Sequence, residues 1–192
     1  MKRILLGTLL LGVTTALHGG DIHGKVVCSG LSSSADAVVY VGAIPGKTFP
    51  PPAEHAKMDQ LNKVFQPHLL AVPVGTTVDF LNDDPFGHNV FTPDACAGKF
   101  NLGTYPKGEK RSHTFSKECF ATILCIVHPE MDAYVAALPT RYFAVTNPDG
   151  SYEIKDVPDG SYTLKVWHPK LKGAGKTVSV HGATQADFQM AR

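Results

Sequence analysis

Long apolar runs, helical periodicity and clustered charge of one sign are all scarce in this chain of 192 residues. Beyond the N-terminal region, no stretch reaches the roughly 20 consecutive apolar residues that a membrane-spanning helix needs. The formal net charge is +1, and no long run of Lys or Arg occurs. A basic surface that would hold nucleic acid is therefore not expected. We predict no nucleic-acid partner and no membrane span.

The first residues carry a targeting pattern. Lys2 and Arg3 precede an apolar run over residues 4–13, and small residues follow it. This order is typical of a secretory signal peptide, and the run is too short to cross a bilayer of roughly 30 Å. We predict a signal peptide over residues 1–20, cleaved near 16–20, and a periplasmic or otherwise exported protein. Loss of two basic residues would change the net charge from +1 to −1.

Period-two alternation of apolar and polar residues is the main structural pattern. It is clear in "TTVDFL" (76–81), "SYEIK" (151–155) and "SYTLKVW" (161–167). Alternation of this kind predicts strands with one buried face. Many short strands favour a sandwich or barrel, so we predict an all-β protein.

Turn signals and a proline-rich stretch divide these strands. "NPDG" (147–150) and "VPDG" (157–160) combine a proline that fixes φ with a glycine that accepts positive φ. We therefore expect a meander of three strands over 144–167. The stretch 43–60, "AIPGKTFPPPAEHAKMDQ", is weakly patterned, as a linker or long loop would be.

The segment "CIVHPEM" places Cys125, His128 and Met131 within one short loop. One type of copper site uses two imidazoles and a thiolate in a plane, with a weak axial thioether. The second imidazole must then come from elsewhere, and "PFGHNVF" (85–91) offers His88 at the start of an apolar segment. We predict a metal site formed by these four side chains.

With these residues in view, the sequence resembles the cupredoxins, the amicyanin- and plastocyanin-like blue copper proteins that include methylamine utilization proteins. The spacing Cys-x2-His-Pro-x-Met is similar to the amicyanin ligand loop, and "HNV" resembles the upstream ligand segment. The resemblance implies a cupredoxin Greek-key sandwich over roughly 65–138 and one bound copper ion that cycles between Cu(I) and Cu(II).

The resemblance also implies roles around the metal. Asn89 would tie the upstream strand to the ligand loop near the Cys125 sulfur, Pro129 is part of the loop motif, and Gly87 could make a weak axial contact. Asn89 as a simple turn residue and Gly87 as a backbone requirement are the competing interpretations. Glu130 departs from the family, which has an apolar residue there, and this weakens the expectation of an apolar docking face.

Zinc and a second copper site are alternatives for the metal-binding residues. His and Cys ligands with an open position also suit zinc, although zinc does not call for the thioether. His55 and Met58 in "EHAKM" could form a second, weaker copper site, but a solvated loop is the favoured interpretation.

Three cysteines remain if Cys125 binds metal, so one of them stays unpaired. Cys96 and Cys119 bracket a segment whose centre, "YPKGEK" (105–110), looks like a hairpin turn. We predict a disulfide between them, which an oxidising compartment permits. Cys28 would remain a buried thiol, although a partnership of Cys28 with one of the others stays open.

Both ends of the chain resemble carboxypeptidase regulatory-like, transthyretin-like β-sandwich modules. Residues 142–171 are similar to the later strands of such a module, and residues 20–41 to its first strands. The resemblance implies N-terminal strands in 21–44, a Pro-rich linker at 45–57, a copper domain at 58–138 inserted into or joined to the module, and its remainder at 139–192.

Two functions compete for this combination. The first is a monomeric electron carrier, not an enzyme, serving a redox partner such as a c-type cytochrome or a dehydrogenase. No His-x-His pair of the kind used by multicopper enzymes occurs. The second is a periplasmic copper-handling protein for delivery, storage or resistance with the same ligands. A third interpretation is an adhesion or docking module with a structural copper.

Overall fold

A computed structural model describes residues 19–192, which form 17 strands and one short 3-10 helix. This nearly all-β structure confirms the predicted fold class. Residues 1–18, most of the predicted signal peptide, lie outside the described residues. Within the described part, no helix has both the length and the apolar character needed to cross a membrane.

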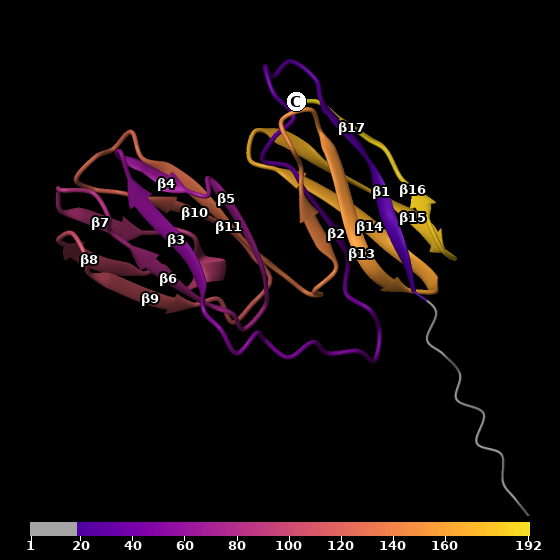
Figure 1. Cartoon of the computed structure of the whole chain (residues 1–192), viewed down its shortest axis with the longest axis horizontal. Coiled ribbons are helices and arrows are strands. Elements are labelled where there is room, and N and C mark those ends of the chain that lie inside the picture. Colours follow the sequence, from indigo (N-terminus) through magenta and orange to yellow (C-terminus); the bar gives the residue numbers. More distant parts are fainter. Residues whose placement is uncertain (1–18) are drawn as a thin grey trace, which may run out of the picture.

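Strands from the two ends of the chain form one β-sandwich, the terminal sandwich (Figure 1). Its strands are β1 (Gly19–Cys28), β2 (Val38–Val41), β12 (Phe143–Val145), β13 (Ser151–Pro158), β14 (Gly160–His168), β15 (Leu171–Val180), β16 (Thr184–Gln185) and β17 (Phe188–Met190). In one sheet, β1 lies between β13 and the parallel strands β16 and β17. The other sheet has the order β12-β2-β14-β15. The N-terminal strands β1 and β2 therefore have partners on both sides.

The middle of the chain forms a second β-sandwich, the central sandwich, which lies beside the first (Figure 1). Its elements are β3 (Ala56–Leu61), β4 (Val64–Gln66), β5 (Leu69–Pro73), β6 (Thr77–Leu81), β7 (His88–Phe91), the 3-10 helix η1 (Ala95–Ala97), β8 (Asn101–Tyr105), β9 (Lys110–Thr114), β10 (Cys119–Leu124) and β11 (Asp132–Leu138). The two sheets have the orders β5-β11-β10-β7-β8 and β4-β3-β6-β9.

The expected meander over 144–167 is wrong. β12, β13 and β14 do occupy this segment, but β13 pairs with β1 while β12 and β14 flank β2. The turn at "NPDG" forms as predicted, with Gly150 at φ +85° and its N–H bonded to Asn147 O over 2.8 Å. The local sequence therefore predicts the turn correctly. The partners of β13 and β14 are β1 and β2, which lie more than 100 residues earlier in the chain.

The proline-rich stretch is irregular only in part. β3 begins at Ala56, within the segment expected to be a linker or loop. Met58 and Gln60 alternate inward in this strand and are both 0% exposed. The polar residues of "AKMDQL" concealed the alternation, because Gln60 is buried through hydrogen bonds rather than through an apolar side chain.

Residues 105–110 connect two sheets and do not form a hairpin, which corrects a second expectation. β8 pairs with β7, whereas β9 pairs with β6 in the opposite sheet. The predicted disulfide is nevertheless present and joins Cys96 in η1 to Cys119 at the start of β10. A cross-link over 23 residues stabilises the fold by roughly 3 kcal/mol in the chain-entropy model. Cys28 is buried and unpaired.

A small apolar cluster joins the two sandwiches. Its buried members come from β2, β5 and β11: Val38, Tyr40, Leu69, Ala136 and Leu138. At its edge the Trp167 ring stacks on Phe120 at a centroid distance of 4.6 Å and an interplanar angle of 13°. Aromatic pairs of this kind contribute about 0.5–1.5 kcal/mol beyond their buried area. The sandwiches are thus packed together through side chains as well as connected by the chain.

Candidate metal centre

The candidate site lies just beyond the end of β10, beside the start of β7. These two strands are antiparallel neighbours, with Leu124 opposite Phe91. Inward positions of β10 alternate through Cys119, Ala121 and Ile123, and the next inward position is Cys125, which is 2% exposed. Period-two geometry therefore carries the thiol into the sandwich at the point where β7 begins with His88.

Residues 125–131 form the loop between β10 and β11. The pair Leu124 and Asp132 closes this loop at its base. Within the loop, the Met131 N–H donates a hydrogen bond to His128 O over 3.0 Å. Met131 is 1% exposed and packs in the same apolar cluster as Cys125. The tight turn before β11 thus returns the thioether to the interior.

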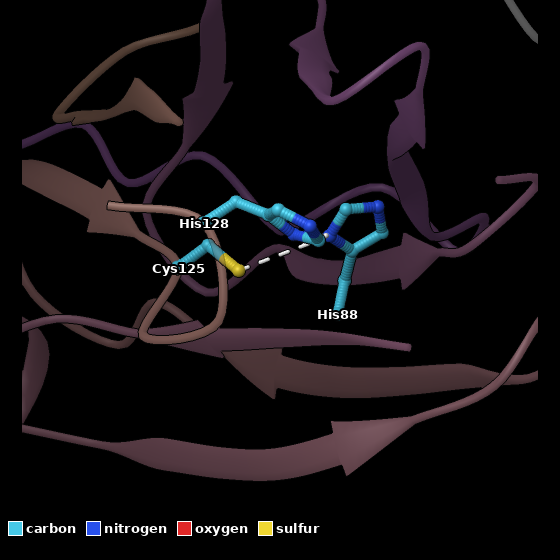
Figure 2. A group of neighbouring side chains, drawn as sticks. All are labelled: His88, Cys125 and His128. Atoms are coloured by element: carbon cyan, nitrogen blue, oxygen red, sulfur yellow. Dashed lines mark hydrogen bonds between the residues drawn. The ribbon is translucent and has the colours of Figure 1, made fainter. Parts of the chain in front are cut away.

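Three of the four predicted ligands converge directly. The ligand atoms of His88, Cys125 and His128 all lie within 4.8 Å of one another. Figure 2 shows the sulfur and both imidazoles directed toward one another. Cys125 Sγ is 3.8 Å from His88 Nδ1, and the Nδ1 atoms of His88 and His128 are 3.0 Å apart.

This arrangement fits a cation. Two ring nitrogens 3.0 Å apart carry lone pairs that repel unless a proton or a cation lies between them. A thiol and two imidazoles, followed by a thioether, are soft and borderline donors that suit copper. Zinc would use the same three side chains. A thioether donor would favour copper over zinc, and the role of the buried Met131 as that donor stays a prediction.

Asn89 connects the two strands at the site. Its backbone N–H donates to Cys125 Sγ over 3.5 Å, and its Oδ1 accepts a hydrogen bond from Ile126 N over 3.4 Å. Its Nδ2 donates to Asn101 Oδ1 over 2.7 Å. The side chain is 2% exposed. The contacts are those expected for a residue that ties the ligand loop to β7.

Gly87 and Pro129, the other two residues predicted near the metal, have less defined surroundings. Gly87 precedes His88, and a side chain there would meet Thr104 Cγ2 at 3.3 Å. Pro129 is exposed on the ligand loop. A metal contact of Gly87 therefore stays a prediction. The alternative second site is not assembled, because Met58 is buried in the core while His55 bonds to Asp79 over 2.8 Å; the favoured interpretation, a solvated loop, is wrong for Met58, which lies in β3.

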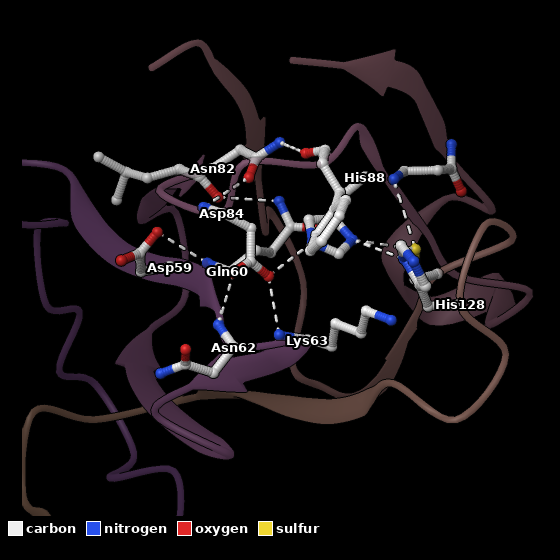
Figure 3. Close-up of polar contacts among 12 residues, drawn as sticks. Asp59, Gln60, Asn62, Lys63, Asn82, Asp84, His88 and His128 are labelled. Atoms are coloured by element: carbon white, nitrogen blue, oxygen red, sulfur yellow. Dashed lines mark hydrogen bonds and ion pairs between the residues drawn. The ribbon is translucent and has the colours of Figure 1, made fainter. Parts of the chain in front are cut away.

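Asp84 is a site residue that the sequence analysis missed. Its Oδ2 is 2.8 Å from His88 Nε2, and both side chains are buried (Figure 3). Burial opposes ionisation of this carboxyl, but hydrogen bonds from Lys63 N, His88 and Asn62 N outweigh it and lower its pKa. The signal available in the sequence was an acidic residue four positions before the histidine.

The mouth of the site is apolar and exposed. Phe86, Ile126 and Val127 are 50%, 59% and 45% exposed, and we call them the mouth patch. The Phe86 ring lies 6.3 Å from the His128 ring, which is itself half-buried. Lys63 Nζ lies 5.2 Å from the Phe86 centroid. His128 is thus the candidate ligand that lies nearest to solvent, bordered by apolar side chains.

Residues 135–187 match the model of a protein family described as polysaccharide lyase family 4, domain II. The match covers less than half of the chain and falls mainly in the terminal sandwich, so it does not assign the protein to that family. The resemblance of this part to carboxypeptidase regulatory-like modules stays a prediction. A search of curated protein sequences gives no significant match.

The similar solved structures include copper proteins. A purple cupredoxin from Nitrosopumilus maritimus is 27% identical, with 43% of this chain and 98% of that chain covered and a TM-score of 0.40. A reduced Cu(I) amicyanin variant at pH 4 is 24% identical, with 53% and 98% covered and a TM-score of 0.42. A copper-containing nitrite reductase from Thermus scotoductus SA-01 is 24% identical, with 60% and 28% covered and a TM-score of 0.43. These neighbours are cupredoxins, and at such TM-scores they assign no function to this chain.

Proposed function

We propose that this chain is an exported mononuclear copper protein that carries single electrons between redox partners. The observation that carries the proposal is the convergence of Cys125 Sγ with one ring nitrogen each of His88 and His128, all within 4.8 Å of one another, with the buried Met131 closing the same loop. Copper held there would supply a reversible one-electron couple between Cu(I) and Cu(II). No substrate pocket is required for this function.

The scaffold around the ligands suits electron transfer because it resists rearrangement. His88 begins β7 and Cys125 directly follows the neighbouring strand β10, and the two are 0% and 2% exposed. Asn89 joins them through hydrogen bonds, and the Cys96–Cys119 disulfide fixes the far end of β10. A change of charge at the centre would therefore require little movement of the protein.

The proposed route for the electron is the His128 edge. His128 is half-buried and is bordered by the mouth patch, which a partner protein could cover. Exposed apolar side chains clustered around one point mark an interaction surface. Glu130 is exposed in the same loop, so the docking face combines apolar contacts with a charge. A c-type cytochrome or a dehydrogenase is the class of partner that we propose.

Export is part of the proposal. The Cys96–Cys119 disulfide supports it, because disulfides persist in oxidising compartments. The signal sequence pattern of residues 1–20 predicts the same compartment. Mass spectrometry of the mature protein should find an N-terminus near residues 16–20, and a retained Met1 in the exported fraction would contradict this part of the proposal.

Copper handling is the alternative function, and the exposed loop residues on either side of His128 (126–127 and 129–130) favour it because they leave the metal open to a competing ligand. The two functions are separated by cycling the copper-loaded protein between oxidation states in the presence of a Cu(I) chelator. A carrier keeps one copper per chain and a constant reduction potential over many cycles. Loss of Cu(I) to the chelator in the first cycles would support delivery or storage instead.

A matched pair of variants assigns the exit route. His128→Ala should abolish fast electron exchange with a soluble redox mediator. His181→Ala, which removes a histidine that is 73% exposed and makes no contact with the site, should behave as the unmodified protein. Equal exchange rates in the two variants would contradict the role of His128.

A further inference from the structure

We infer that Asp84 is a positioning residue of the metal centre: its carboxylate, fixed by the β3–β4 turn, holds His88 as the Nε2–H tautomer with the Nδ1 lone pair directed at Cys125. The inference rests on the proposed function, because it concerns the same site. His88 lies between the two partners, with Asp84 Oδ2 2.8 Å from Nε2 and Cys125 Sγ 3.8 Å from Nδ1.

The turn that fixes the carboxylate has an unusual backbone. Asn62 and Lys63 have φ values of 56° and 57°, and Leu61 pairs with Val64 on either side of them. Two consecutive left-handed residues in a two-residue loop form a type I′ hairpin turn. The N–H groups of Asn62 and Lys63 donate to Asp84 Oδ1 and Oδ2, each over 2.7 Å (Figure 3). Both carboxylate oxygens are therefore anchored by backbone atoms.

The segment between Asp84 and His88 is braced from the other side. Asp84 N donates to Asn82 Oδ1 over 3.0 Å and to Gln60 O over 3.1 Å. Asn82 Nδ2 donates to Phe86 O over 2.8 Å and to Tyr105 O over 2.9 Å. Asp84 is held through its backbone and its side chain, so it presents one fixed acceptor to the imidazole.

The tautomer follows from this geometry. An ionised carboxylate only accepts hydrogen bonds, so the nitrogen facing it must carry the proton. A neutral imidazole has one N–H, and with the proton on Nε2 the Nδ1 atom keeps its lone pair. In a ligand histidine, a hydrogen-bond acceptor at one ring nitrogen fixes the proton there and leaves the other nitrogen free to bind metal.

The carboxylate also changes the donor strength of His88. A hydrogen bond from Nε2–H to a buried anion increases the electron density that the ring offers at Nδ1. A stronger donor favours Cu(II) over Cu(I). Loss of the Asp84 charge should therefore weaken Cu(II) binding and raise the reduction potential.

Asp84→Asn and Asp83→Asn form the matched pair. Asp83 is the adjacent carboxylate but is exposed, and the carboxylate bonded to His88 is that of Asp84. An amide at position 84 would turn its NH2 group either toward the Asn62 N–H or toward the Lys63 N–H and His88 Nε2. Each orientation sets an N–H donor against at least one other donor. The second orientation also donates to Nε2 and favours the Nδ1–H tautomer of His88. We expect Cu(II) binding to weaken about 10- to 100-fold in Asp84→Asn, with a higher potential. Asp83→Asn should match the unmodified protein in both measurements.

The histidine tautomer itself is measured without metal. Long-range ¹H–¹⁵N correlation spectra of the metal-free full-length protein at one neutral pH should show His88 protonated at Nε2, and the Asp84→Asn spectrum should lose this state. If Asp84→Asn fails to fold, the spectrum of the unmodified protein alone still tests the inference. A His88 ring protonated at Nδ1 in the unmodified protein would overturn the inference, as would copper affinity and potential unchanged in a folded Asp84→Asn protein.

The two proposals fail in different ways. If the unmodified protein forms no thiolate–copper band, the proposed function fails, while the metal-free spectrum still tests the role of Asp84. If the band forms and Asp84→Asn alters neither the tautomer nor the potential, the inference fails and the proposed function remains.

Discussion

The Asn89 backbone N–H donates a hydrogen bond to Cys125 Sγ over 3.5 Å, although 36 residues separate the two in the chain. The Asn89 side chain accepts a second bond from the amide of Ile126, the next residue of the ligand loop. A donor to a thiolate withdraws electron density from the sulfur, and the second bond fixes the loop that carries the sulfur. β7 therefore helps to position the cysteine, and its backbone donor would also tune a thiolate at that position.

Asn89→Ala tests the second of these contacts. The substitution keeps the backbone donor to sulfur but frees the Ile126 amide, so we expect faster copper loss and about 1 kcal/mol lower stability of the metal-free protein. Copper dissociation rates and denaturant unfolding measure the two effects. Asn101→Ala removes the contact between the two asparagine side chains, together with the hydrogen bond that Asn101 Oδ1 accepts from Gly103 N, but it keeps the bond to the Ile126 amide and should release copper at the original rate. Equal rates in both variants would contradict the loop-fixing role.

Met131→Leu tests the axial thioether. Leucine has nearly the same volume, so the fold should lose less than about 1.5 kcal/mol. Copper should remain bound, and the reduction potential should rise because loss of a donor favours Cu(I). Voltammetry measures the potential. Met58→Leu is the control, since Met58 is equally buried in the same core but is not near the ligand loop in sequence. Complete loss of metal in Met131→Leu would show that the axial role is wrong.

An ion pair between the sandwiches should make stability depend on pH. His68 Nδ1 is 2.8 Å from Asp36 Oδ2, and this contact raises the pKa of His68 and lowers that of Asp36. The stabilisation of the folded state by protonated His68 is complete below pH 6.5 and is lost as pH rises through the raised pKa of His68. The stabilisation by ionised Asp36 is present above pH 3.8 and is lost as pH falls through the lowered pKa of Asp36. The bond is therefore strongest at mildly acidic pH.

Asp36→Asn measures that dependence. The side chains of Asp36 and His68 are both partly exposed. The free energy of unfolding of the metal-free protein should therefore fall by less than about 1 kcal/mol near pH 5.5, and by a smaller amount near pH 9. Asn tolerates the φ of 59° found at this position. Asp156→Asn, at φ 55° and without an ion pair among the described residues, is the control. A loss that is larger at pH 9 would contradict the assignment.

The terminal sandwich should not form from its C-terminal part alone. A fragment of residues 139–192 lacks β1 and β2, which lie between other strands in the two sheets. Both sheets would then expose unpaired edges, and a third of the buried core residues would be missing. We expect no cooperative melt from this fragment unless residues 19–44 are supplied as a second chain. A cooperative melt of the fragment alone would show that the two sandwiches are ordinary consecutive domains.

Local chemistry and long-range pairing were not equally predictable from this sequence. The alternation in "SYTLKVW" and the turn ending at Gly150 were readable from a few residues, because their causes are local. The Cys96–Cys119 pair is present as predicted, but the hairpin at 105–110 on which that prediction rested does not form. The sheet that each strand joins was not readable, since β13 finds its partner in β1. The expected hairpin at 105–110 failed for the same reason.

The candidate site shows the same division. His88, Cys125, His128 and Met131 were predicted as a group because their spacing and donor types point to one chemistry. Asp84 was missed, because its importance depends on the backbone amides of Asn62 and Lys63, which reach it only after β3, β4 and the segment before β7 have packed. A buried carboxylate is identified by its partners, and these are not visible in the sequence.

The central claim is that Cys125 binds copper as a thiolate, and the visible absorption spectrum of the purified protein with one equivalent of Cu(II) tests it most directly. The account predicts an intense thiolate-to-copper charge-transfer band that is absent in Cys125→Ser and retained in Cys28→Ser, which removes the other unpaired cysteine. A colourless copper complex, or a full-strength band in Cys125→Ser, would contradict it.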